Sequence, residues 1–157
     1  MASDRPADLT DVEGVLRRTV EVLRENEEKF RIAFENAPMG MSIVGPTGRF
    51  LAVNATLCRM FGYSREELLA GTFNTITHPD DIERGNLWVR KMMSGDYSEP
   101  EFEKRYLHKD GHVVWGLVRA QWVRNDDGSP RMSVVHVLDI TGRKSAEQVL
   151  LARERQL

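Results

Sequence analysis

The sequence predicts an α+β protein in which a five-stranded antiparallel sheet is covered on one face by short helices. Two short apolar runs joined by a turn occupy residues 39–53, helical segments follow over residues 54–95, and three longer runs rich in β-branched and aromatic residues occupy residues 102–141. Strands and helices are therefore segregated along the chain. Segregated elements of this kind pack as a sheet with its helices on one side.

The composition allows one ordinary domain with an additional arm. The chain has 157 residues, of which 41% are hydrophobic and 29% charged, and 22 basic residues stand against 24 acidic ones without a long block of like charge. Nothing here favours nucleic acid or an anionic membrane surface as a partner, and no apolar run approaches the length of a membrane span. The N-terminal MASDRPADLT lacks the apolar core of a signal peptide and the single Cys58 excludes an internal disulfide, so we expect a cytoplasmic protein.

A long helix is expected first, from Thr10 to about Asn36, because this stretch contains neither proline nor a cluster of turn residues. Its seam positions alternate three and four residues apart, which places them on one side of the helix. The helix either lies on its own sheet or pairs with a second copy. Pairing is favoured for residues 9–23 because a helix this long exceeds one small sheet, whereas residues 27–36 are expected to pack on the domain. The residues expected at a homodimer interface are Leu9, Val12, Leu16, Leu23 and Asn26.

Two short strands follow the long helix. Proline disfavours the helical conformation in the residue before it, so Pro38 ends the helix. Residues 39–44 and 49–53 are then apolar runs on either side of Gly45-Pro46-Thr47-Gly48, which has the composition of a hairpin turn.

Three helices are expected between the hairpin and the last strands. Asn54 caps the first of them, which runs through Phe61. Ser64 and Glu67 have the spacing of a capping box and begin the second. His78-Pro79-Asp80-Asp81 begins the third, which is expected to end near Ser94.

Three antiparallel strands are expected at residues 102–141, separated by turns at residues 109–111 and 125–130. Gly116 and Ala120 are small residues in the middle of the central strand, so either another backbone comes close or a space is left for a ligand. In the second case Gly116→Leu is expected to fold and to abolish ligand binding. The face that carries both consists of Val114, Gly116, Val118, Ala120 and Trp122.

Short motifs occur along these elements in a definite order. They are Asn36-Ala37-Pro38, Val53-Asn54-Ala55, Phe61-Gly62-Tyr63-Ser64-Arg65-Glu66-Glu67-Leu68, His78-Pro79-Asp80-Asp81, Lys109-Asp110-Gly111 and Asp139-Ile140-Thr141. In this order and spacing they resemble a PAS domain of the type with a C-terminal PAC motif, and the resemblance covers about residues 27–143. It implies a PAS fold at residues 27–140, preceded by a dimerisation arm at residues 1–26 and followed by a linker helix at residues 141–157.

The resemblance also implies a pocket between the inner face of the sheet and the helices. A small-molecule ligand in this pocket is the alternative to a domain that only mediates interactions, in which side chains fill the space. The residues expected to line the pocket are Cys58, Trp88, Met92, Tyr106, Gly116, Val118, Ala120, Val135 and Val137.

No resident cofactor is the first expectation, with flavin as the alternative. Flavin-binding members of the family place a tryptophan on the helix that here carries Trp88, where a ring can stack on an isoalloxazine. Light-sensing members carry a reactive cysteine in a pattern that Cys58 matches neither in register nor in context. Haem is disfavoured, because haem-binding members supply a histidine from the helix that here spans Ile82 to Met93 and contains none.

The last helix has no C-terminal cap before Leu157, so we expect it to continue in a longer parent protein. In the family this helix leaves the last strand through the segment that here reads Asp139-Ile140-Thr141 and connects to an output domain, often a histidine kinase or a cyclic-di-nucleotide enzyme. The resemblance therefore implies a sensory and dimerisation module of a bacterial signalling protein.

Neither catalysis nor a metal site is expected within the chain. The carboxylates Glu66, Glu67, Asp80 and Asp81 stand at helix starts, where the helix dipole explains them, and no nucleophile motif is present. His108 and His112 flank a turn without an evident third and fourth ligand. His136 alternates onto the outer face of the last strand and is expected under the N-terminal helix or at a dimer contact.

Overall fold

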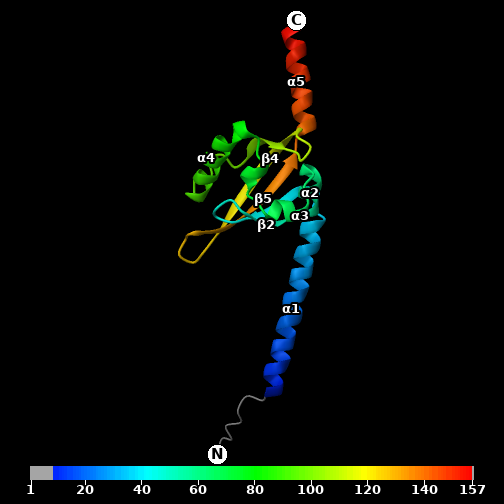
Figure 1. Cartoon of the computed structure of the whole chain (residues 1–157). Coiled ribbons are helices and arrows are strands. Elements are labelled where there is room, and N and C mark those ends of the chain that lie inside the picture. Colours follow the sequence, from blue (N-terminus) through cyan, green and yellow to red (C-terminus); the bar gives the residue numbers. More distant parts are fainter. Residues whose placement is uncertain (1–8, 157) are drawn as a thin grey trace, which may run out of the picture. The chain divides into compact units, whose positions relative to one another are not determined.

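The computed structural model of this chain describes residues 9–156, which form two compact units, one ending at Glu35 and the other beginning at Asn36. Residues 1–8 of the expected arm and Leu157 lie outside the described residues. The first unit is a single helix, and the second contains the sheet and all the other helices (Figure 1).

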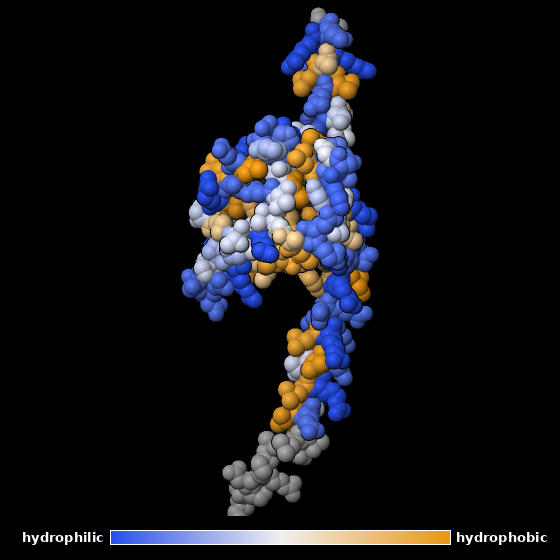
Figure 2. Space-filling view, viewed as in Figure 1, coloured by the Kyte–Doolittle hydropathy of each residue, from blue (hydrophilic) through white to orange (hydrophobic). Residues whose placement is uncertain are grey.

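Helix α1 (Leu9–Glu35) spans 27 residues and continues without a break across residue 26, as the absence of proline and turn residues predicted. Leu16 and Leu23 are 59% and 62% exposed, and Val12 and Asn26 are exposed as well. Leu9 begins the helix, but its side chain is outside the described part. Figure 2 shows the apolar side chains gathered along α1.

The second unit is built on one five-stranded sheet with the strand order β2-β1-β5-β4-β3, in which every neighbouring pair is antiparallel. The predicted number of strands and their antiparallel pairing are confirmed. The last strand, β5, lies at the centre because it pairs with β1 on one side and β4 on the other. The strands are β1 (Gly40–Val44), β2 (Phe50–Val53), β3 (Phe102–Leu107), β4 (Val113–Arg124) and β5 (Pro130–Asp139).

Local chemistry places the helices as expected. Asn54 caps α2 (Ala55–Phe61) by accepting a hydrogen bond from Leu57 N at 2.9 Å. Ser64 and Glu67 form the predicted capping box at the start of α3 (Arg65–Leu69). The third predicted helix begins with the 3₁₀ turn η2 (Pro79–Asp81) and continues as α4 (Ile82–Met93), whereas the short 3₁₀ helix η1 (Phe73–Ile76) was not predicted.

The core lies between one face of the sheet and these helices (Figure 1). Leu57, Phe61 and Met92 come from the helices and are almost completely buried, and they meet inward-facing strand residues such as Val118 and Val137. Burial of this apolar surface is the main stabilising contribution to the second unit.

The final helix, α5 (Thr141–Gln156), has no buried residue. Within the described residues, no helix is both long and apolar enough to cross a membrane.

Candidate functional site: a cavity between sheet and helices

A cavity of about 330 Å³ lies between the inner face of the sheet, α4 and η1. Seven of the nine residues expected in the pocket line it: Trp88, Met92, Tyr106, Val118, Ala120, Val135 and Val137. The period-two alternation of the strands brings the five strand residues together, and the 3.6-residue period of α4 places Trp88 and Met92 on its buried side.

Gly116, the eighth residue, lies outside the lining because Tyr106 packs over it. A Cβ atom at Gly116 would stand 2.6 Å from Cε2 of the Tyr106 ring and 2.8 Å from Cγ1 of Val137. The small residue therefore admits a neighbouring side chain, neither a backbone nor a ligand. The packing argues against the expectation that Gly116→Leu folds undisturbed, since already a Cβ atom there requires the Tyr106 ring or the Val137 side chain to shift.

Cys58, the ninth residue, is half-buried on α2 and packs against the core, not the cavity. Because it is the chain's single cysteine, no thiol lines the cavity wall. A thiol adduct with a bound cofactor therefore has no support in this geometry.

Trp88 is held by two contacts that leave its role structural. Its Nε1–H donates to the carbonyl oxygen of Glu99 at 2.8 Å, and its ring stacks on Phe102 with the ring centroids 5.4 Å apart. One face of the indole is thus already covered by Phe102 and is not available to stack on an isoalloxazine.

Lys104 is a cavity residue that the sequence analysis missed. It lies on β3 between Phe102 and Tyr106, so the alternation that turns those two rings inward turns the lysine inward as well. The sequence analysis predicts a strand here without assigning its inward face. The two aromatic residues at positions 102 and 106 were the signal that could have placed Lys104, which lies midway between them, on the inner face of the strand.

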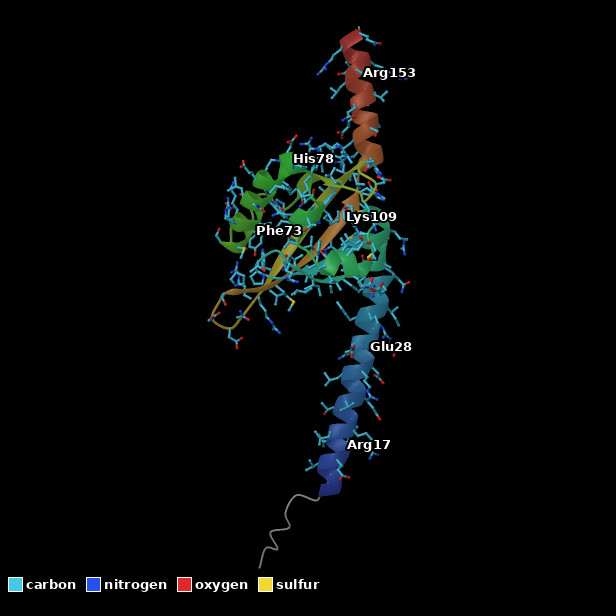
Figure 3. All side chains as sticks on the ribbon, in the orientation of Figure 1. Arg17, Glu28, Phe73, His78, Lys109 and Arg153 are labelled. Atoms are coloured by element: carbon cyan, nitrogen blue, oxygen red, sulfur yellow. The ribbon has the colours of Figure 1, made fainter. Side chains whose placement is uncertain are left out.

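The Lys104 ammonium is surrounded by aromatic rings and one hydroxyl. The residue is 5% exposed, its Nζ donates to Thr77 Oγ1 at 3.0 Å, and Nζ stands 5.0 Å and 4.7 Å from the ring centroids of Phe73 and Tyr106. Phe73 belongs to η1 and is labelled in Figure 3. Burial lowers the pKa of Lys104 from 10.5 to about 8, an effect that the charge of Asp81 only partly opposes.

The nearby carboxylate of Asp81 is already engaged by two arginines. Arg105 donates to it from its backbone N at 2.7 Å and from its guanidinium at 3.1 Å and 2.8 Å, and Arg84 lies 3.7 Å away. Burial would raise the pKa of Asp81, but the Arg105 hydrogen bonds outweigh it and lower the pKa to about 2. Lys104 therefore shares one carboxylate with two other cations.

Two further polar groups of the cavity have no hydrogen-bond partner among the described residues. They are Oγ of Ser133, a residue only 2% exposed, and Oδ1 of Asn74. Buried polar groups are normally hydrogen-bonded, so each such atom asks for an explanation. The alternation of the last strand places Ser133 on the inner face with Val135 and Val137, whereas Asn74, in the short helix η1, carries no distinctive sequence pattern.

The turn between β3 and β4 brings His108, Asp110 and His112 together, with their ligand atoms within 4.8 Å of one another. The sequence analysis counted only the two histidines. Backbone hydrogen bonds explain the grouping: His112 N donates to Asp110 Oδ1 at 2.9 Å, and Asp110 N donates to His108 Nδ1 at 3.1 Å. The three side chains therefore stabilise a tight turn.

The predicted signal-transfer residues Asp139, Ile140 and Thr141 form the junction between β5 and α5. Thr141 donates from N and from Oγ1 to Asp139 Oδ1 at 2.9 Å and 2.6 Å, and its Oγ1 accepts from Trp115 N at 3.0 Å. Ile140 is buried, and its N donates to the Trp115 carbonyl oxygen at 2.9 Å. The end of the sheet and the start of the helix are therefore connected by β4.

The first turn of α5 is also tied to β3. Glu103 forms ion pairs with Arg143 and, at 2.5 Å, with Lys144, whose Nζ lies 4.8 Å from the centroid of the Trp115 ring. The hydrogen bond from Lys144 lowers the pKa of Glu103. Beyond this turn Val149, Leu150 and Leu151 are exposed.

Comparison with known proteins agrees with this architecture. Residues 50–136, more than half of the chain, match the family described as PAS fold. This chain belongs to the PAS fold family. The structure of a sensory box histidine kinase/response regulator from Burkholderia thailandensis is similar to this PAS domain with a TM-score of 0.62 and 25% identity, over 82% of this chain and 99% of that one.

Curated relatives of this PAS domain are signalling proteins of much greater length. A probable diguanylate cyclase, DgcE of Escherichia coli (strain K12), is 39% identical over 127 residues, which is 81% of this chain and 12% of that protein. The sensor histidine kinase TmoS of Ectopseudomonas mendocina is 22% identical over 86% of this chain and 14% of its own length. The chain thus spans about one eighth of the length of these relatives.

Proposed function

We propose that this PAS domain is the sensory module of a larger signalling protein and that it passes its state to an output domain through α5. The observation that carries the proposal is the attachment of the first turn of α5 to β3 and β4, the strands whose opposite faces line the cavity. The relatives indicate the class of output, a diguanylate cyclase or a histidine kinase.

Strand β3 connects the cavity directly with α5. Glu103 and Lys104 are consecutive residues, so their side chains leave the strand on opposite faces. Lys104 enters the cavity, and Glu103 binds Arg143 and Lys144 of α5. A displacement of β3 at Lys104 therefore moves the anchor of α5, which is the kind of small shift that helical linkers transmit.

A chimera tests the relay. Residues 1–157 are joined through α5 to the catalytic domain of the Escherichia coli diguanylate cyclase, and turnover is compared with that of the catalytic domain alone. Glu103→Gln should change turnover by severalfold without changing the melting temperature by more than a few degrees, because it removes the anchor of α5 and leaves the core intact.

Glu101→Gln is the matched control for the chimera. Glu101 forms an exposed ion pair with Arg119 on β4 and does not contact α5. A chimera in which both variants behave as the unmodified protein, or in which both change turnover equally, would contradict a relay through Glu103.

The proposed module works as a homodimer through α1. Val12, Leu16 and Leu23 are exposed at three-four spacing on a 27-residue helix, and a second copy of the same helix covers such a stripe in a coiled coil. Asn26 on the same seam favours one register. A parallel pair brings both α5 helices to the same end, where an output pair can respond.

The dimer is tested by replacing Leu16 and Leu23 with Asp and measuring mass by light scattering. The double variant should be a folded monomer with the circular dichroism of the sheet retained. Arg17→Asp with Arg24→Asp is the control, since it has the same seven-residue spacing, lies off the seam and adds more negative charge. A double leucine variant that remains dimeric would place the contact outside α1.

A ligand-binding sensor is the second candidate, favoured by the cavity and by the polar groups without partners in its wall. An absorption spectrum of the purified protein separates flavin from colourless ligands, because flavin absorbs visible light.

A further inference from the structure

We propose that the cavity binds a small molecule that pairs an anionic group, a carboxylate in the first instance, with Lys104 and lays an apolar body along the sheet. The proposal rests on the sensory function in one respect, that this molecule is the signal. Its chemistry follows from the cavity alone.

Lys104 is buried without an anion of its own. An ammonium group in a protein interior is costly unless a carboxylate or an equivalent charge lies against it. Among the described residues Lys104 has no carboxylate within salt-bridge distance, and its one hydrogen bond goes to the neutral hydroxyl of Thr77. An ammonium group has three N–H donors, so donors remain for a further acceptor.

The surroundings of Lys104 carry excess positive charge. Asp81 is the carboxylate that acts on Lys104, and its oxygens already accept from Arg105 and face Arg84. Asp80 also acts on Arg105 through its charge, but its side chain is exposed, so Asp81 is the one buried carboxylate among these three cations and a deficit of negative charge remains. An anion entering the cavity reduces that deficit, whereas a cation increases it.

The remainder of the cavity wall suits an apolar body. The neighbouring lining is mostly aromatic and aliphatic and includes Phe61, Phe73, Trp88, Met92, Val118 and Val137. A volume of about 330 Å³ has room for on the order of ten non-hydrogen atoms, since a water molecule occupies about 30 Å³ in the liquid.

Ser133 lies far from Lys104 along the sheet. Lys104 pairs with Gly116 and Ser133 with Trp122, so the two polar residues are separated by six positions along β4, roughly 20 Å of strand. Ser133 Oγ therefore cannot serve the same ligand atom as Lys104. A ligand of about ten non-hydrogen atoms that is anchored at Lys104 does not reach Ser133 Oγ, so Ser133 takes no part in its recognition.

The test uses three probes of suitable size, octanoate, 4-phenylbutyrate and indole-3-propionate, each compared with its own primary amide. Binding to the purified chain is measured by calorimetry and by the fluorescence of Trp88 and Trp122, which both line the cavity. At least one carboxylate should bind tenfold or more tightly than its amide, because a charge-assisted hydrogen bond is stronger than a neutral one.

Lys104→Met should reduce the affinity for that carboxylate at least tenfold and leave the affinity for the amide within about threefold. Lys109→Met is the matched control. Lys109 lies in the turn that follows the same strand and forms an exposed ion pair with Glu67 at 2.8 Å (labelled in Figure 3), so its loss removes the same charge without touching the cavity. Lys104→Arg, which keeps the charge, covers the case in which the methionine variant does not fold.

Four outcomes decide the matter. Loss of carboxylate binding in Lys104→Met with retention in Lys109→Met supports the proposal. Equal binding of acids and amides overturns the recognition of charge but leaves a ligand-binding sensor. Binding retained in Lys104→Met places the anchor elsewhere and overturns it, and so does the absence of binding by all three acids at millimolar concentration. The relay through α5 is judged separately by the chimera, so its failure is distinguishable from each of these.

Discussion

Replacing Lys104 with Met should make the ligand-free protein more stable at neutral pH. Burial lowers the pKa of Lys104 from 10.5 to about 8, so the folded state at pH 7 holds a charge that it disfavours by roughly 3 kcal/mol. Methionine fills a similar volume without a charge. The variant loses the hydrogen bond to Thr77 and the contacts with two rings, and this loss reduces the gain in the free energy of unfolding by roughly 1 kcal/mol. The expected net gain is about 2 kcal/mol.

The pH dependence of this gain identifies its cause. Below pH 8 the lysine is protonated in both states and the whole penalty is present. Between pH 8 and 10.5 the unfolded chain binds more protons than the folded one, so the unmodified protein becomes more stable relative to the variant as the pH rises. Above the unfolded value the penalty has disappeared.

Urea unfolding at pH 7 and pH 10 measures the gain in stability and its dependence on pH. The comparison of variant with unmodified protein at each pH removes the contribution of the other titrating groups. The gain of Lys104→Met should narrow clearly at the higher pH. Lys109→Met should leave the free energy of unfolding almost unchanged at pH 7, since exposed ion pairs contribute little. A methionine variant that is less stable at pH 7, with no narrowing at pH 10, would refute a buried, uncompensated charge at Lys104.

Three further substitutions test the packing and the ion pairs of the domain. Gly116→Ala should lower the free energy of unfolding by roughly 1–3 kcal/mol in urea, because its methyl group meets Tyr106, and an unchanged value would contradict the packing described. Asn54→Ala should cost roughly 2–4 kcal/mol, since its Oδ1 accepts from the backbone N of Met41 and of Leu57 and its Nδ2 donates to the Met39 carbonyl oxygen; an unchanged urea midpoint would contradict these contacts. The carboxyl of Asp81 has a pKa of about 2 in the folded protein against 3.8 in the unfolded chain, so its contribution to the free energy of unfolding is present above about pH 4 and is lost as the pH falls to 2. The urea midpoint should therefore fall less steeply with acid in Asp81→Asn than in the unmodified protein. An identical slope would exclude a stabilising role of the ionised Asp81.

Much of the fold could be predicted because its signals are local. Asn54, Ser64 and Glu67 are capping residues whose chemistry acts within one helical turn, and the turns at residues 109–111 and 125–130 separate the last strands by composition alone. The short helix η1 escaped prediction because a single 3₁₀ turn has no periodicity to detect.

The site was harder to predict because its decisive features depend on partners far apart in the sequence. Seven lining residues followed from the resemblance to the PAS family, yet Gly116 was expected in the lining and lies outside it, since only the structure places the Tyr106 ring above it. Lys104 was overlooked because a lysine in a strand is usually exposed. The missing partners of Ser133 and Asn74 are a property of the folded arrangement, which no pattern of neighbours in the sequence reveals.

The packing of Tyr106 over Gly116 limits how the size of the cavity can change during evolution. The ring acts as a removable spacer, because a smaller side chain at position 106 lengthens the cavity along β4 beside Lys104 without altering a backbone hydrogen bond. Position 116 offers no such freedom, since any side chain there displaces the ring. A smaller side chain at position 106 is therefore expected to admit larger molecules to the proposed site, while Gly116 stays fixed and the proposed preference of Lys104 for an anion is kept.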